Sequence, residues 1–112
     1  MPSHMNRKAA RRDLAEAPIV KALLKTGCSV VKLSDTGVPD LLVAYPMLWP
    51  HPEGDPNYEM VLMEVKTGNA ALTKDEEKFF DTWKGSRIIV RTPQQALMYI
   101  GVPESDFHLY ID

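Results

Sequence analysis

The segments GVPDLLVAY (residues 37–45) and MVLMEVKTG (residues 60–68) decide the fold, because both have the length and apolar composition of strands inside a sheet. The first segment is apolar on both faces after Asp40, which predicts a central strand covered on both sides. Side chains alternate along the second segment, so Glu64 and Lys66 share one face of it. Because a buried charge is costly unless it is paired or bound to a metal ion, these charged residues need a partner.

A helix is expected on the N-terminal side of these strands. Residues 16–27 carry an apolar stripe at helical spacing, and Gly27 follows as a C-terminal cap. Pro18 requires that a new helix starts near Glu16 or that a longer helix kinks there. The remaining expected elements are a strand at 28–34, a helix at 72–85, a strand at 87–92, a helix at 92–101 and a final strand at 107–111.

Side-chain caps mark where the two later helices begin. Thr73, with Glu76 three residues on, forms a capping box. Thr92 is expected to cap the next helix in the same way, with Pro93 in its first position and Gln95 closing the box. The capping box gives Glu76 a structural role of its own. The element order is therefore helix, three strands, helix, strand, helix, strand, or αβββαβαβ. Such an order predicts an α/β fold with a mixed central sheet flanked by helices on both faces.

The composition of the chain indicates one small domain. With 112 residues, 45% of them hydrophobic, and a formal charge of −2, the chain is long enough for a single core. One cysteine and three widely spaced histidines support neither a disulfide framework nor a structural zinc site, which fits a reducing cytoplasm. No apolar run approaches the roughly 20 residues that cross a bilayer. The opening MPSHM (residues 1–5) resembles the remnant of an expression tag, so we expect a single domain at residues 6–112.

The charged residues of the two strands match a known motif. Pro39 and Asp40, followed by a hydrophobic strand that ends in Glu64, Val65 and Lys66, resemble the PD-(D/E)XK nuclease superfamily. The motif order is similar to two of its branches, the virus-type replication-repair nuclease (VRR-NUC) domains and the archaeal Holliday-junction resolvases. The resemblance implies a restriction-endonuclease-like core and a metal-dependent endonuclease that hydrolyses phosphodiester bonds of DNA.

The resemblance covers the chain from about Glu16 to Ala96. Along this stretch a glutamate on the first helix, a glycine after it, G-x-P-D-L, E-V-K and L-T-x-x-(Q/E) follow in the family's order. One position departs from the pattern, since the family often has glutamine where Glu76 stands. The capping box already accounts for a glutamate at position 76, so whether Glu76 also belongs to the metal site is left open.

The resemblance also implies what each charged residue does. Asp40, Glu64 and the backbone carbonyl of Val65 would hold a Mg²⁺ ion, for which Mn²⁺ can substitute, and Glu16 would join directly or through water. Lys66 would orient the attacking water or neutralise charge on the phosphoryl oxygens. The physical chemistry agrees, because converging carboxylates repel one another unless a hard cation lies between them. The implied products are a 5′-phosphate and a 3′-hydroxyl.

The N-terminal segment carries the basic residues Arg7, Lys8, Arg11 and Arg12. These residues would contact DNA phosphates beside the metal; alternatively, they form a solvated helix face. We expect branched DNA such as a four-way junction to be recognised by shape, because nothing resembles a recognition helix or a zinc module. The expected setting is DNA repair, by a bacterial or phage-encoded protein in the cytoplasm.

Symmetric cutting of a junction needs two active sites, so we expect a homodimer. Its contact surface is expected on the second helix, which has more large apolar side chains than the buried face of a short helix can hold: Phe79, Phe80 and Trp83. The proline-rich loop at residues 46–57, with Trp49, is the other expected surface. The alternatives are that these aromatic side chains fill the core, and that the loop is a tolerated insertion rather than a lid or partner-binding loop.

Other interpretations of the charged strand residues stay open. Glu64 and Lys66 could form a salt bridge at a strand end, with Asp40 a turn residue after Pro39. The fold could serve as a non-catalytic DNA- or partner-binding module. It could also be a nuclease of another substrate class, whether nonspecific, restriction-like or RNA-directed.

Overall fold

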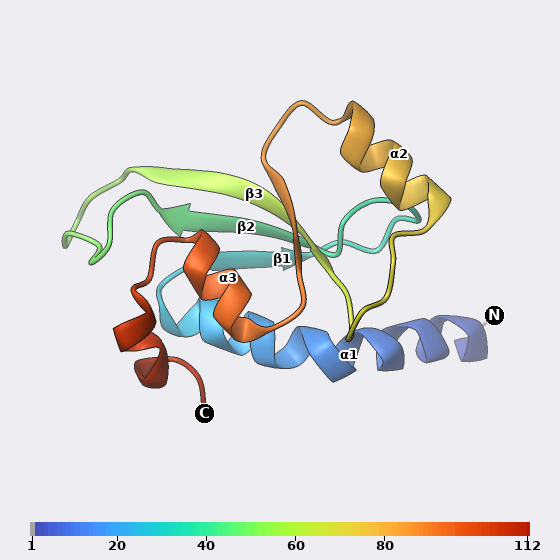
Figure 1. Ribbon diagram of the computed structural model, residues 1–112, viewed down its shortest axis with the longest axis horizontal. Helices are drawn as coiled ribbons and strands as arrows, with labels where there is room; N and C mark the ends of the chain where they lie inside the picture. Colours follow the sequence, from blue (N-terminus) through green and yellow to red (C-terminus); the bar gives the residue numbers. More distant parts are fainter. Residues whose placement is uncertain (1) are drawn as a thin grey trace.

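The computed structural model describes residues 2–112, with side chains described from residue 14 onward. Its elements follow in the order α1 Pro2–Lys25, β1 Ser29–Lys32, β2 Leu41–Pro46, β3 Tyr58–Val65, α2 Lys74–Thr82, β4 Arg87–Val90, α3 Pro93–Tyr99 and the 3₁₀ helix η1 Glu104–Leu109 (Figure 1). Within the described residues, no helix is long and apolar enough to cross a bilayer.

The strands form one mixed sheet in the order β1-β2-β3-β4. β1 and β3 both pair with β2 in antiparallel fashion, whereas β4 is parallel to β3. A parallel neighbour cannot be reached by a tight turn, so the chain leaves the sheet after β3, forms α2 and returns as β4. The expected α/β fold with a mixed sheet and flanking helices is confirmed.

The core lies on the face of the sheet that α1 and α3 cover (Figure 1). The register of β2 and β3 pairs Leu41 with Met63 and Val43 with Val61, so these side chains share that face, and all of them are buried. The helical part of the same cluster consists of Ile19, Ala22, Leu23, Ala96 and Leu97. Removal of this apolar surface from water holds the two helices on the sheet.

The opposite face of the sheet is covered much less. On this face β2 and β3 pair Leu42 with Leu62 and Ala44 with Met60, and Met60 is 63% exposed. α2 lies at one end of the sheet (Figure 1), and none of its residues is buried. The structure therefore differs from the expectation of helices packed on both faces. The reason is that α2 has only 9 residues, most of them polar, and so offers little apolar surface to bury.

α1 ends as its sequence predicts. The Cys28 N–H donates to the Leu23 carbonyl at 3.2 Å, and Gly27 has a φ of +92°, a left-handed conformation that glycine adopts without steric cost. Pro18 lies inside α1. The longer helix, and not a new start near Glu16, is therefore the observed arrangement.

The predicted final strand at residues 107–111 is wrong, because this segment lies in and directly after η1. The Phe107 carbonyl accepts hydrogen bonds from the N–H groups of Tyr110 at 2.9 Å and Ile111 at 3.0 Å. These three side chains follow a helical spacing of three and four residues and pack against the core. So short an apolar pattern fits a helical turn as well as a strand, and Pro103 at the N-cap of η1 favours the turn.

The proline-rich loop at residues 46–57 is fastened to the C-terminal segment. The Trp49 ring packs edge-on against Tyr110, with centroids 5.4 Å apart, and its Nε1–H donates to Asp106 at 3.4 Å. Trp49 therefore contributes to packing within the molecule.

Candidate active site

Asp40 and Glu64 meet where β2 begins and β3 ends. The pairing of Leu41 with Met63 places the residues next to them, Asp40 and Glu64, beside each other. Asp40 Oδ2 accepts a hydrogen bond from the Val65 N–H at 2.7 Å, which fixes this carboxylate against β3. Asp40 is half-buried and Glu64 is 3% exposed. The structure thus brings together two of the residues that the sequence predicted for a site.

The turn before Asp40 makes close backbone contacts. The Leu33 N–H donates to the Asp40 carbonyl at 2.8 Å. Gly37 has a φ of +80°, and a Cβ at this position would lie 3.0 Å from Asp75 Cβ, so glycine lets the turn approach α2 closely. A cavity of about 40 Å³ lies between this turn, Asp40 and Glu76. A space of this size admits a water molecule or a small ion.

Burial and neighbouring carboxylates favour the protonated form of Glu64. Burial is the largest cause, repulsion from Asp40 and Glu76 and a hydrogen bond between the Glu64 and Asp40 side chains add to it, and Lys66 opposes them only in part, so the pKa of Glu64 rises to about 9. Its Oε1 is buried and has no hydrogen-bond partner. A cation bound to this oxygen would offset the cost of burying a charged carboxylate and would supply the partner that the oxygen lacks.

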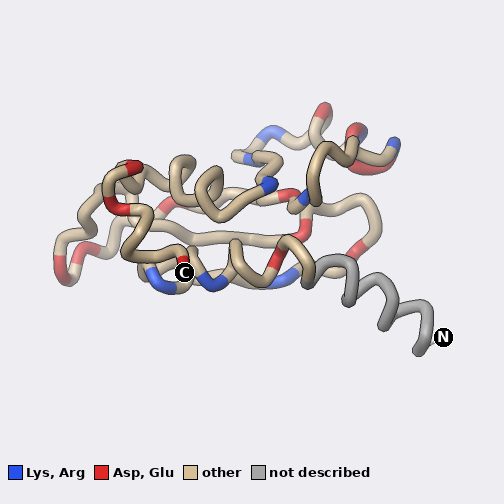
Figure 2. The backbone as a smooth tube through the Cα atoms, turned by 60° about the horizontal axis from the view of Figure 1, so that its bottom comes forward, with Lys and Arg blue, Asp and Glu red and all other residues tan. Residues whose placement is uncertain are grey.

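Lys66 lies between Glu64 and Glu76. Its Nζ is 2.6 Å from Glu76 Oε1 and 3.8 Å from Glu64 Oε2, and its side chain is 14% exposed. A salt bridge between Glu64 and Lys66 therefore exists, as the alternative interpretation held, but the shorter contact of the lysine is with α2. Figure 2 shows acidic and basic segments gathered at this end of the sheet, beside α2.

Glu76 has two roles at once. The predicted capping box is confirmed, because Glu76 Oε1 accepts the Thr73 N–H at 2.8 Å and the Glu76 N–H donates to Thr73 Oγ1 at 3.3 Å. Burial alone would raise the pKa of Glu76, but hydrogen bonds from Lys66 and from the Thr73 N–H outweigh it and lower that pKa. The sequence left open whether Glu76 belongs to the site, and its contact with Lys66 places it there.

Glu16 is buried on α1, 1% exposed, and its Oε2 lies 3.6 Å from Lys32 Nζ on β1. Across the described part of the chain, no three or more His, Cys, Asp or Glu side chains form a group that could hold a metal ion. Glu16, Asp40 and Glu64 are thus not gathered into a three-carboxylate cluster, whereas Asp40 and Glu64 form a pair.

The pair of Asp40 and Glu64 nevertheless fits a hard divalent cation. Mg²⁺ is commonly held through one or two carboxylates and keeps several of its waters, so a third acidic ligand is not required. The unpartnered Oε1 of Glu64 is an oxygen donor of the kind that Mg²⁺ prefers. The predicted phosphate contacts of Arg7, Lys8, Arg11 and Arg12 lie outside the residues whose side chains are described.

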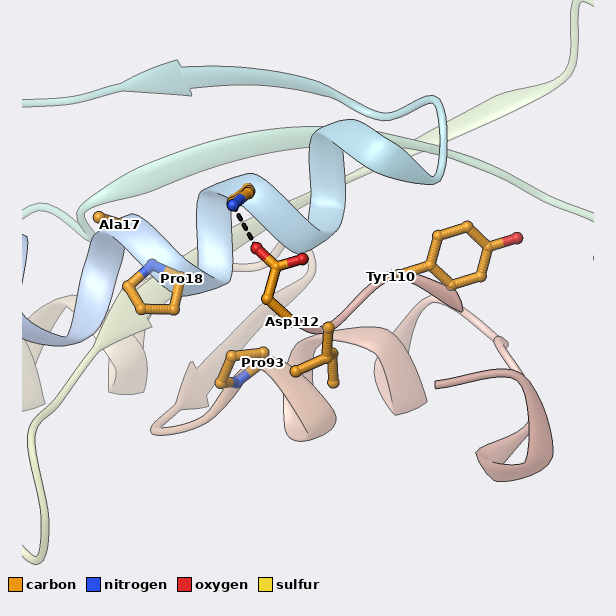
Figure 3. Close-up of a pocket in the computed structure, with 7 residues that line it drawn as sticks. Ala17, Pro18, Pro93, Tyr110 and Asp112 are labelled. Carbon is orange, nitrogen blue, oxygen red and sulfur yellow. Dashed lines mark hydrogen bonds and ion pairs between the residues drawn. The ribbon is translucent and has the colours of Figure 1, made fainter. Parts of the chain in front are cut away.

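A larger pocket, of about 400 Å³, lies between α1 and the C-terminal residues (Figure 3). Asp112 points toward α1, where it forms ion pairs with Lys21 and, at 2.8 Å, with Lys25. Hydrogen bonds from these two lysines lower the pKa of Asp112 to about 2. The contacts fasten the last residue to α1, and we assign the pocket a structural role.

No protein-family model, curated protein or solved structure matches this chain. The resemblance to PD-(D/E)XK nucleases therefore stays a hypothesis. The fold, the pair of Asp40 with the buried Glu64 and the adjacent lysine are the features on which a function can be proposed.

Proposed function

We propose that this protein is a Mg²⁺-dependent endonuclease of the PD-(D/E)XK type that hydrolyses phosphodiester bonds of branched DNA. The observation that carries the proposal is the buried Oε1 of Glu64, which has no hydrogen-bond partner and belongs to a residue adjacent to Asp40. A carboxylate with a strongly perturbed pKa that lacks full compensation is typical of a functional site. The element order from α1 to β4, one helix, three strands, one helix and one strand, supports a restriction-endonuclease-like core.

In this proposal the acidic residues bind the metal ion and Lys66 acts on the phosphate. Asp40, Glu64 and the Val65 carbonyl bind the cation, and Glu16 acts through a water molecule because a lysine of β1 already pairs with it. When bound, Mg²⁺ would polarise the scissile phosphate and activate a water for attack. The Lys66 ammonium donates to the phosphoryl oxygens and neutralises the charge that develops on them.

Cleavage of labelled substrates tests the proposal directly. We expect a four-way junction to be cut faster than a flap, a linear duplex or a single strand, and only with Mg²⁺ or Mn²⁺ present. Cleavage that persists in excess EDTA would contradict the metal mechanism. Binding without cleavage of any substrate would favour the non-catalytic module instead.

A contact surface between two copies of the chain is available on α2. Phe79 and Trp83 stack with ring centroids 5.1 Å apart, and Trp83 is 45% exposed. Phe79 lies in α2, which has no buried residue, and Trp83 is the exposed C-cap of this helix, so neither side chain is part of the buried core. We propose that they join two chains into a homodimer with two active sites, as symmetric cutting of a junction requires.

The dimer can be tested by light scattering. We expect the wild type to be a dimer and Trp83→Lys to be a folded monomer whose melting temperature falls by a few degrees, because the substitution also removes the stacking of Trp83 on Phe79. Met98→Lys, at a residue of α3 that is 63% exposed, is the matched control and should remain dimeric. A monomeric wild type, or equal cleavage of junction and linear duplex, would contradict this prediction.

Lys66 should be needed for cleavage but not for binding of the metal. We expect Lys66→Ala to lower kcat by about 100-fold or more, because it removes a donor to the developing charge. Mn²⁺ should still bind, because an ammonium is a donor and not a ligand. Isothermal titration with Mn²⁺ separates the two roles, and Glu16→Gln should give an intermediate loss of activity. Loss of Mn²⁺ binding in Lys66→Ala would show that the lysine has been assigned the wrong role.

A further inference from the structure

A single oxygen atom of Glu76 accepts from two donors. Glu76 Oε1 lies 2.8 Å from the Thr73 nitrogen and 2.6 Å from Lys66 Nζ. The first contact closes the capping box at the N-terminus of α2, and the second reaches across to the residue that follows β3. Lys66 is thereby tied to the beginning of a helix.

The ammonium of Lys66 has two acidic neighbours, and both are shielded from water. The side chains of Lys66, Glu64 and Glu76 are 14%, 3% and 16% exposed, so solvent screens their charges weakly. Lys66 Nζ is 3.8 Å from Glu64 Oε2, farther than from Glu76. The capping box holds Glu76 in place, so the shorter contact of the ammonium is with a fixed carboxylate.

We propose that Glu76 is a positioning residue that holds the Lys66 ammonium away from Glu64 and so keeps the Glu64 carboxylate available for a divalent cation. The inference rests on the metal site of the proposed function and adds a role for Glu76 that the capping box does not require. An ammonium and a metal ion compete for the same carboxylate oxygens. Without a charge at position 76, Glu64 is the carboxylate that remains beside Lys66, and the two would pair.

The chain offers variants that separate this role from helix capping. Glu76→Gln removes the charge but keeps an amide oxygen that can accept the Thr73 N–H. Thr73→Ala removes the hydroxyl cap and leaves the charge of Glu76 unchanged. Lys66→Met removes the ammonium and keeps a side chain of similar length, so that the effect of Glu76→Gln can be measured without the competitor.

Isothermal titration with Mn²⁺ alone, without DNA, is the decisive measurement. We expect Glu76→Gln to weaken Mn²⁺ binding about tenfold, the lower end of the loss typical when a residue that orients a ligand is changed. Thr73→Ala should lower the melting temperature and leave Mn²⁺ affinity unchanged. In the Lys66→Met background, Glu76→Gln should cause a much smaller loss, because the competing ammonium is gone.

The outcomes distinguish this inference from the proposed function. If the wild type binds Mn²⁺ and Glu76→Gln binds it equally well, the positioning role is overturned while the metal site stands. If Glu76→Gln loses as much Mn²⁺ affinity in the Lys66→Met background as in the wild type, the negative charge of Glu76 attracts the metal ion directly and not by positioning Lys66. The positioning role is then again overturned. A wild type that binds no Mn²⁺ would overturn the metal site, and this inference with it.

Discussion

Replacing Asp40 by asparagine or Glu64 by glutamine should abolish Mg²⁺-dependent cleavage of a four-way junction and leave the fold and DNA binding largely intact. Each substitution removes one anionic oxygen from the proposed site and keeps the shape of the side chain. A loss of about 4 kcal/mol of transition-state stabilisation corresponds to a fall in kcat of about a thousandfold. In Asp40→Asn the new amide oxygen can still accept the hydrogen bond from the Val65 N–H, so the contact of this side chain with β3 should be kept.

Single-turnover cleavage measures this loss, with circular dichroism for the fold and filter binding for DNA affinity. Glu59→Gln is the matched control, because Glu59 is an exposed carboxylate on the same strand, β3, hydrogen-bonded by the Tyr45 hydroxyl at 3.1 Å. It should cleave at the wild-type rate. Near-wild-type cleavage by Asp40→Asn or Glu64→Gln would show that the carboxylate pair is not the catalytic site.

The second large effect is on stability, where Glu64→Gln should make the metal-free protein more stable at pH 8. The pKa of Glu64 is raised from 4.5 to about 9 in the folded chain, so the folded state holds a proton that the unfolded state releases. Stability from this proton is fully present below pH 4.5 and is lost as the pH rises toward 9. Glutamine is neutral at every pH and avoids this loss. We expect an advantage of about 5 kcal/mol at pH 8 and almost none at pH 4.

Thermal unfolding in EDTA between pH 4 and pH 9 measures the difference between the two proteins. The melting curves should coincide at the acidic end and diverge as the pH rises, by on the order of 20 °C at pH 8. Added Mn²⁺ should then stabilise the wild type and leave Glu64→Gln unchanged, because a ligand stabilises only the folded state that binds it. Parallel curves over the whole pH range would mean that Glu64 ionises normally, and the argument for a cation site would be lost.

Much of the secondary structure could be predicted from the sequence, because the information is local. Continuous apolar runs of strand length mark β2 and β3, and the capping box of Thr73 and Glu76 marks the start of α2. The final segment was predicted wrongly because local sequence information alone does not distinguish a strand from a helical turn there. Phe107, Tyr110 and Ile111 satisfy a helical spacing as well as an alternating one, and only their packing against the core decides between the two.

The sequence by itself determined that Asp40 begins one strand and that Glu64 lies near the end of the next, since the apolar runs beside them set strand type, and the pairing of the two strands brings these residues together. Tertiary structure decided which other groups reach them. The contact of Lys66 with Glu76 depends on how α2 returns to the sheet, and the contact of Glu16 with Lys32 depends on how α1 packs under β1. A side-chain pattern records the period of one element, whereas the distance between two elements depends on the packing of all residues between them. For this reason the acidic pair could be predicted from the sequence, and the residue that holds its lysine could not.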